Sequence, residues 1–241
     1  MQITGSTLKW LAMVTMVLDH LAAVVLMPRY GIAFNGSFDF STAASYGAMG
    51  VLCYSMRLIG RLAFPIFCFL LVEGLVHTHS RSLYLRNLLV LALVSEVPFD
   101  LCVRAQCIAP DVQNTILTLV LGFLLCCALD ACDQLLPYGQ ALVLKLCAVP
   151  IFMALAALLG TDYDAFGIGL IVLLYLLRRN RKEQCLAAAV VCFYELSASL
   201  AFVPIYFYNG QRGRQNKWFF YVFYPAHLLV LYGLRRLWLG W

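Results

Sequence analysis

Charged residues are scarce in this chain. Asp, Glu, Lys and Arg together make up 12% of its 241 residues, whereas 63% of the residues are hydrophobic. A soluble domain of this length carries about twice that share of charge. The net charge of +5 comes mostly from short loops between apolar runs, so it reports membrane topology. The composition therefore argues against a soluble fold and against a nucleic-acid partner.

Metal-binding and redox spacings are lacking as well. The chain has ten cysteines, but no two of them form a C-x-x-C pair, and their spacing fits no metal framework. Most lie inside apolar runs, where cysteine behaves as a small buried hydrophobe. We expect no metal site. The sequence also shows no internal repeat and no paired broken helices, which are typical of many transporters.

Apolar runs close to twenty residues long, the length of a membrane-crossing helix, dominate the chain. They predict an all-α integral membrane bundle of about eight transmembrane helices, with seven to nine allowed, forming a single domain over residues 1–241. The sixth span is short enough to be re-entrant, and the polar stretch 29–47 has room for an interfacial helix. The expected spans are residues 7–27, 52–77, 82–103, 114–129, 141–159, 166–177, 185–207 and 218–238.

Basic residues gather in three places: the loop before the third span, the loop before the seventh span, and the C-terminus. Short basic loops stay in the cytoplasm, so we predict a protein of the cytoplasmic membrane with both termini cytoplasmic. The first run is too long and too polar for a cleaved signal peptide, and we expect it to remain as an anchor. The basic loop 208–217 falls outside in this arrangement, and we interpret its cations as ligand-binding.

The first run carries Asp19 and His20 deep in its apolar sequence. Polar groups of this kind inside a membrane usually face a bundle interior or a wet cavity. Lys9 precedes His20 by eleven residues. This is about three helical turns, so the two side chains share one face of the helix, about 16.5 Å apart. A mutually satisfied, purely structural Asp19–His20 pair is the alternative.

Under this topology, polar residues from most segments meet at one level in the outer half of the membrane. Two of them, Arg57 and Arg61, lie one turn apart on one helix face, repel each other and need anions nearby. Protein carboxylates or a bound anionic ligand would both satisfy that need. The full set is Asp19, His20, Arg57, Arg61, Glu96, Asp100, Asn114, Asp162, Asn209, Arg212 and His227.

Seven segments of the chain, in the same order, resemble proteins of the TraX family. They are LDH at 18–20, RLIGRLAFPIFCFLLVEG at 57–74, SEVPFDL at 95–101, QNTILTLVLG at 113–122, DYDAFG at 162–167, YNGQRG at 208–213 and FFYVFYPAHLLVLY at 219–232. TraX proteins are named for N-terminal acetylation of conjugative pilin and resemble a wider group of multi-span acyltransferases. That group's first helix commonly carries a basic residue, ten further residues and then a histidine, as Lys9 and His20 do. Many members lack a pilus system, so the resemblance does not imply an acceptor.

The resemblance implies a membrane-embedded acetyltransferase that uses cytoplasmic acetyl-CoA. His20 would act as general base or carry the acyl group itself, with Asp19 and Arg61 completing the catalytic set. A basic inner rim suits the polyanionic end of CoA, and its residues are Lys9, Arg81, Arg178 and Arg179. The acceptor would be a peptide N-terminus, a glycan or a small molecule on the far side, and its expected contacts are Arg57, Glu96, Asp100, Asn114, Asp162, Asn209, Arg212 and His227. A proton-coupled transporter, which would use the same buried polar groups, is the alternative.

Overall fold

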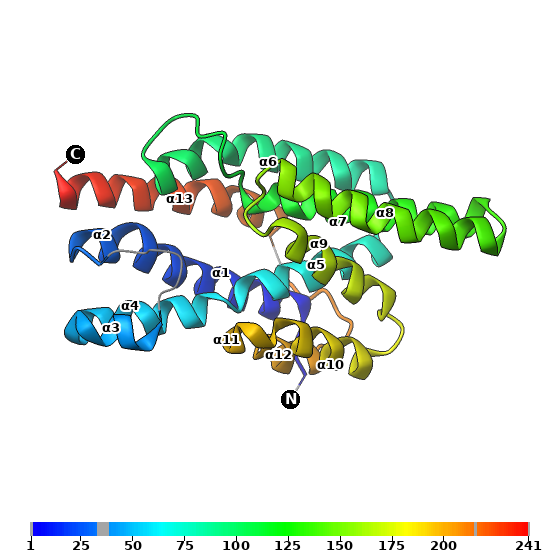
Figure 1. The fold of residues 1–241 in the computed structure, drawn as a ribbon, viewed down its shortest axis with the longest axis horizontal. Helices are drawn as coiled ribbons and strands as arrows, with labels where there is room; N and C mark the ends of the chain where they lie inside the picture. Colours follow the sequence, from blue (N-terminus) through cyan, green and yellow to red (C-terminus); the bar gives the residue numbers. More distant parts are fainter. Residues whose placement is uncertain (1, 33–38, 215, 241) are drawn as a thin grey trace.

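The computed structural model describes residues 2–32, 39–214 and 216–240, and they fold into helices with no β-strand among them. Four helical stretches are long and apolar enough to cross a membrane: Gly5–Arg29, Gly47–His77, Thr115–Leu135 and Tyr138–Leu158. The helices lie roughly along one axis and pack side by side (Figure 1). The predicted all-α membrane bundle is therefore confirmed, while the number of crossings stays a prediction.

The first helical stretch joins α1 (Gly5–His20), the π-helical turn η1 (Leu21–Leu26) and α2 (Met27–Arg29). The wide turn follows from the proline at position 28, which has no N–H and crowds the carbonyl four residues earlier. The Met27 N–H bonds to the carbonyl of Ala22, five residues back, which relieves that crowding. His20 thus lies where the regular helix gives way to a wider turn, a feature frequent at functional sites.

The predicted span 52–77 is longer in the structure and broken in the middle. After the short helix α3 (Phe40–Ser45), α4 (Gly47–Gly60) and α5 (Ala63–His77) meet at a tight turn, where the Leu62 N–H bonds to the Ile59 carbonyl. Pro65 in the first turn of α5 cannot continue the α4 hydrogen bonds. The expected interfacial helix within 29–47 corresponds to α3, although residues 33–38 of that stretch lie outside the described residues.

Five further helices match predicted spans in position: α6 (Arg81–Arg104), α7 (Thr115–Leu135), α8 (Tyr138–Leu158), α9 (Asp164–Leu176) and α13 (Lys217–Leu239). α6 packs beside α13, and α7, α8 and α9 pack against one another. The α7–α8 hairpin extends past the other helices at one end of the molecule (Figure 1). The α7–α8 hairpin is therefore shifted along the long axis of the bundle relative to the other helices.

The prediction of one continuous span over 185–207 is wrong. The chain there forms α10 (Arg181–Val191), turns back around Glu195, and returns through the short helices α11 (Leu196–Ser199) and α12 (Phe202–Tyr206). α12 packs beside α10, and the Ser199 hydroxyl donates to the Ala189 carbonyl at 2.9 Å. A straight helix would carry Glu195 into an apolar layer, whereas the turn places this carboxylate among polar groups.

The reversal of the chain around Glu195 changes the position of the loop that follows α12. The Ile3 N–H bonds to the Phe207 carbonyl at 3.0 Å, the Asn209 N–H to the Ile3 carbonyl at 2.9 Å, and the Gly5 N–H to the Gln211 carbonyl at 2.9 Å. The loop after α12 therefore lies against the N-terminus, and its predicted place on the opposite side is wrong. Its cations join the other basic loops at the N-terminal end of the bundle, which agrees with the rule for basic loops.

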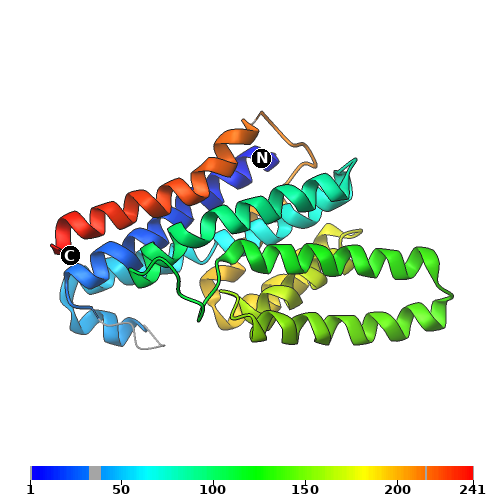
Figure 2. The same cartoon turned by 90° about the horizontal axis from the view of Figure 1, so that it is seen from above.

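The last helix consequently runs parallel to the first. Trp10 packs on Phe219 with ring centroids 5.3 Å apart, and, further along both helices, His20 packs on His227 at 5.2 Å. The C-terminus lies beside α2, at the end of the bundle away from the N-terminus (Figures 1 and 2). The two termini therefore lie at opposite ends of the bundle, while the cytoplasmic side of each terminus stays a prediction.

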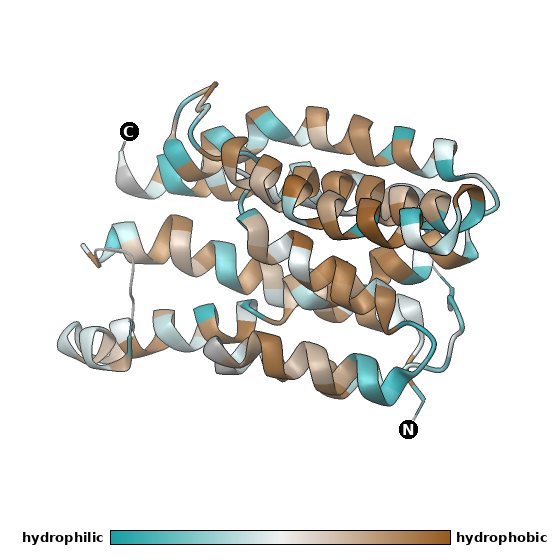
Figure 3. Cartoon of the chain, turned by 45° about the vertical axis from the view of Figure 1, so that its right-hand side comes forward, coloured by the Kyte–Doolittle hydropathy of each residue, from teal (hydrophilic) through white to brown (hydrophobic). Residues whose placement is uncertain are grey.

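The outer surface of the helices is apolar, and hydrophilic residues gather at the turns and ends (Figure 3). α8 shows this most clearly, because Leu144, Leu146 and Ile151 are between 49% and 66% exposed. Side chains of this kind suit contact with lipid chains. Several polar residues of the expected site, among them Asp19, His20 and Arg57, lie inside the bundle, whereas Arg81, Arg179 and Arg212 are exposed.

The hairpin formed by α10 to α12 predicts a labelling pattern. In a chain stripped of native cysteines, Arg179→Cys and Gln211→Cys should react with an impermeant thiol reagent from the same side of the membrane. Trp238→Cys should react from the other side, because α13 runs away from the N-terminal end. Labelling intact cells and inverted vesicles measures both sides, and opposite sidedness for the first two positions would disprove the hairpin.

Candidate functional site

A cavity of about 1310 Å³ lies inside the bundle. Gly5, Lys9 and Arg212 line it at the N-terminal end, and Ile32 and Arg235 line it at the opposite end. Between these ends its wall carries polar and charged side chains, among them Asp19, His20, Arg57, Arg61, Asp162 and Glu195. The lining of the cavity thus extends from one end of the bundle to the other, with polar side chains in its middle. This is the arrangement expected where side chains contact a ligand.

His20 and His227 form a pair at the cavity wall. Nδ1 of His20 lies 2.9 Å from Nε2 of His227, and the two rings are stacked with an angle of 6° between their planes. Nδ1 of His227 lies 3.0 Å from the carbonyl oxygen of Phe223, one turn earlier on α13. His20 lines the cavity, whereas His227 lies behind it and reaches the cavity through His20.

Asp19 is bound to Arg57. The guanidinium donates from one terminal nitrogen to Oδ2 of Asp19 at 2.5 Å, and both side chains are about 15% exposed, at 16% and 15%. Gly60 makes this approach possible, since a Cβ there would lie 2.2 Å from the Cβ of Asp19. Of the two anion sources left open by the sequence, a protein carboxylate satisfies Arg57.

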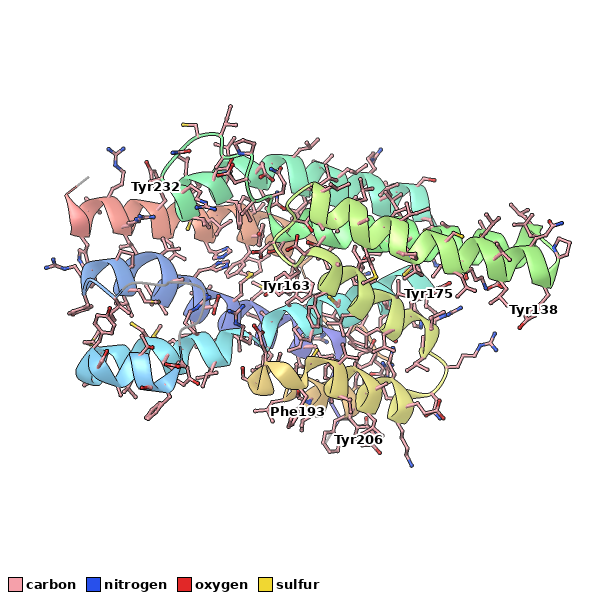
Figure 4. All side chains as sticks on the ribbon, in the orientation of Figure 1. Tyr138, Tyr163, Tyr175, Phe193, Tyr206 and Tyr232 are labelled. Carbon is pink, nitrogen blue, oxygen red and sulfur yellow. The ribbon has the colours of Figure 1, made fainter. Side chains whose placement is uncertain are left out.

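Arg61 is held more loosely than Arg57. Its Nε lies 3.7 Å from Oε2 of Glu195, which the turn after α10 brings to the cavity. The ring of Phe64 in the next turn stacks on Tyr163 with centroids 3.4 Å apart, near the centre of the bundle (Figure 4). Glu195 was not among the predicted site residues, because a carboxylate within an apparent straight span gives no sign of the turn that places it here.

Asp162 adds a third carboxylate to the cavity wall. It lies in the connection between α8 and α9 and accepts a hydrogen bond from the Thr115 hydroxyl at 2.6 Å. Burial raises the pKa of the Asp162 carboxyl, and the Thr115 hydrogen bond and the Arg61 charge offset only part of that effect. Three carboxylates and two guanidinium groups therefore share the middle of the cavity.

Three residues expected to bind an acceptor instead hold the connection between α6 and α7. The Asn114 side chain caps α7 by accepting from the Ile116 N–H at 2.9 Å, and its amide donates to the Glu96 carboxylate. The Asp100 carboxylate accepts from the Ala109 N–H at 2.8 Å. Glu96, Asp100 and Asn114 lie outside the cavity lining, so we leave them out of the site proposed below.

The predicted basic rim divides into two groups. Arg81 and Arg178 both pair with Asp130 on α7, which also accepts from the Tyr175 hydroxyl (Figure 4). Asp130 offsets part of their charge, and a lone acidic residue near the end of a predicted span gave no warning of this contact. Arg179 is exposed in the turn beside them.

Lys9 forms the second group and lines the cavity, where it is joined by Arg212, a residue that was expected to contact the acceptor instead. The ammonium group of Lys9 lies 5.2 Å from the centre of the Phe220 ring. Arg212 is positioned by its own backbone carbonyl, which accepts from the Ser6 N–H at 2.9 Å. Asn209 belongs to the same loop, where its side chain accepts from the Gln211 N–H at 2.9 Å and shapes the turn.

Apolar helices of membrane-crossing length around a charged inner cavity define a polytopic helical membrane protein. In the described part of the chain, no group of three or more His, Cys, Asp or Glu side chains is arranged to hold a metal ion.

Comparison with known proteins gives the family. The chain belongs to the TraX family, whose model, described as TraX protein, matches residues 4–235. It is also 26% identical over 249 residues to the probable fimbrial assembly protein FimC, serogroup H1, of Dichelobacter nodosus, covering 93% of this chain and 92% of that protein. No solved structure matches the chain. The family resemblance seen in the sequence is confirmed.

Because Asp19 packs against Gly60, we expect replacement by alanine to change stability differently at Gly60 and at Gly233. Gly60→Ala should lower the free energy of unfolding by about 1–3 kcal/mol, because the added methyl overpacks the ion-pair site. Gly233→Ala is the matched helical control, since nothing lies within 4 Å of its added Cβ, and it should be neutral or slightly stabilising. Thermal unfolding in detergent measures both, and equal melting temperatures would show that the helices are not in this contact.

Proposed function

We propose that this protein is a membrane-embedded acyltransferase that moves an acetyl group from acetyl-CoA to an amine or hydroxyl acceptor. The observation that carries this proposal is that His20, which pairs with His227 behind it, lines a cavity whose lining reaches both ends of the bundle. Donor and acceptor can then approach one imidazole from opposite sides. Membership of the TraX family and the likeness to a fimbrial assembly protein support the same class of activity.

In this proposal His20 is the general base. The acceptor nitrogen or oxygen attacks the thioester carbonyl carbon while its proton moves to the imidazole. The carbon–sulfur bond then breaks, the acetyl group stays on the acceptor, and the imidazolium returns the proton to the leaving thiolate. His20 ends the cycle neutral and ready for another turnover.

The two arginines have different parts in this scheme. Arg57 is committed to Asp19 at 2.5 Å and keeps α4 in place against α1. Arg61, whose contact with Glu195 is 3.7 Å, is the better candidate to stabilise negative charge on the thioester oxygen in the transition state. Asp19 therefore acts on the site by holding Arg57, and Asp162 and Glu195 balance the charge of the arginines around the acceptor.

The donor enters at the N-terminal end. Lys9 and Arg212 line the cavity there and suit the phosphates of CoA, while Arg81 and Arg178 both pair with Asp130 and lie outside the cavity lining. The basic loops gather at this end, so we place it in the cytoplasm, where acetyl-CoA is made. The acceptor then enters from the opposite end, past Ile32 and Arg235.

A proton-coupled transporter is the second candidate, because several carboxylates, Asp19, Asp162 and Glu195 among them, line a cavity that reaches both ends. Buried acidic groups of this kind also serve proton relays. The two functions differ in what the purified protein consumes. Use of acetyl-CoA favours the enzyme, and movement of protons with a solute in the absence of acetyl-CoA use favours the transporter.

His20→Ala should abolish acetyl transfer, since general base catalysis contributes about 10²–10⁴-fold to a rate. The variant should still fold and bind acetyl-CoA, because the donor contacts lie at the N-terminal end of the cavity. Transfer of labelled acetyl groups, the melting temperature and the acetyl-CoA dissociation constant check these points. A variant that transfers at the wild-type rate would exclude His20 as the base.

Lysine substitutions separate the two arginines. Lysine keeps the charge but loses the planar, two-pronged donor geometry. Arg61→Lys should keep its melting temperature and lose turnover, by about 2.7–4 kcal/mol if an oxyanion donor is removed. Arg57→Lys should mainly lower stability, by no more than the roughly 3–5 kcal/mol of a fully broken buried pair.

Melting temperature and acetyl transfer, measured for both lysine variants, decide the assignment. An Arg61→Lys protein that unfolds at a much lower temperature would make that arginine structural. A stable and fully active one would remove it from the reaction.

A further inference from the structure

His227 lies behind the catalytic cavity and takes no direct part in the reaction proposed above. Its ring is 8% exposed and is stacked between His20, at 5.2 Å between centroids, and Phe223, at 5.1 Å. Both stacking angles are small, 6° and 11°. The ring is thus fixed in one orientation, with one nitrogen toward His20 and the other toward the helix backbone.

The donor and the acceptor of each hydrogen bond to the His227 ring can be assigned. The Phe223 carbonyl can only accept, so Nδ1 of His227, 3.0 Å away, carries the hydrogen. A neutral imidazole has one N–H, and Nε2 of His227 is therefore an acceptor. The hydrogen between the two rings, across 2.9 Å, must then belong to Nδ1 of His20.

We propose that His227 is a positioning residue that fixes the tautomer of His20, so that its Nε2 holds the lone pair that accepts the acceptor's proton. The inference rests on the proposed function for its catalytic meaning and on the geometry for the tautomer itself. A histidine free in water favours the other tautomer, with the hydrogen on Nε2, and would present a donor where a base is needed. The chain from the Phe223 carbonyl through His227 to His20 does for this base what the third member of a catalytic triad does for its histidine.

The chain of hydrogen bonds also persists during the reaction. When His20 takes a proton on Nε2, its Nδ1–H still donates to Nε2 of His227, so no group has to rotate. The π-helical turn that begins directly after His20 gives the first helix the irregular backbone found at functional sites. His227 on α13 thereby links the last helix of the bundle to a base on the first.

Two substitutions at position 227 separate hydrogen bonding from packing. His227→Phe keeps an aromatic ring between His20 and Phe223 but removes the acceptor. His227→Gln removes the ring but places an amide oxygen near the position of Nε2. The Phe variant should lose at least about tenfold in kcat with the KM for acetyl-CoA unchanged, because the fraction of His20 in the active tautomer falls.

The Gln variant should retain kcat within about threefold of wild type. A packing role predicts the reverse order, with Phe the better replacement. A Gln variant as impaired as the Phe variant, or a Phe variant at the wild-type kcat, would therefore overturn the proposal.

A second measurement is independent of both activity and folding of the variants. The chain has four histidines, so ring-labelled ¹⁵N-histidine spectra of the wild-type protein are simple, and loss of signals in His20→Ala assigns that residue. We expect a protonated Nδ1 and an unprotonated Nε2 for His20. The opposite pattern overturns the tautomer assignment, whereas the expected pattern in a protein without acetyl transfer refutes the proposed function alone.

Discussion

Arg57 and Arg61 lie with the carboxylates of Asp19, Asp162 and Glu195 at the wall of the cavity inside the bundle. Asp19 and Arg57 form the tightest contact of this group, and it joins α1 to α4 through the space that Gly60 leaves open. A buried charge without its partner is strongly destabilising, so the helices that carry these groups must assemble in one register. The turn at Glu195 follows the same constraint, because it brings a carboxylate to Arg61 rather than to lipid.

Hydropathy predicted most of the helices, and it failed where a polar residue bends the chain. The apolar runs over 114–129, 141–159 and 166–177 correspond to α7, α8 and α9. The run over 185–207 has the length of a span, yet its chain reverses around Glu195, and length alone cannot reveal a reversal. That one error placed the following loop and the C-terminus at the wrong ends of the bundle.

The relative positions of candidate site residues were predictable where the residues belong to the same helix. Helical spacing placed Lys9 and His20 on one face, and both line the cavity. Partners on other helices were not predictable in the same way, because a sequence gives no distances between helices. Asp130 pairs with two arginines that were expected to bind the donor. His227 was expected to touch an acceptor and instead touches His20.

The parallel course of α1 and α13 gives the cavity its direction. Lys9 and Arg212 lie at the N-terminal end together with the basic loops, the two histidines meet further along both helices, and Arg235 lies at the opposite end. A polyanionic donor and a separate acceptor would then reach His20 from different ends. In the proposed function, one imidazole would serve a reaction whose substrates are on opposite sides of a membrane.

The side of the membrane from which the protein uses acetyl-CoA tests the proposed donor path most directly. Protein reconstituted into vesicles in one orientation, established by labelling at position 179, would receive radiolabelled acetyl-CoA on one side at a time. We predict slow, His20-dependent release of CoA only when the donor is on the side of the N-terminus. Release from the opposite side, or equal release from both sides, would contradict a donor path through the N-terminal end of the cavity.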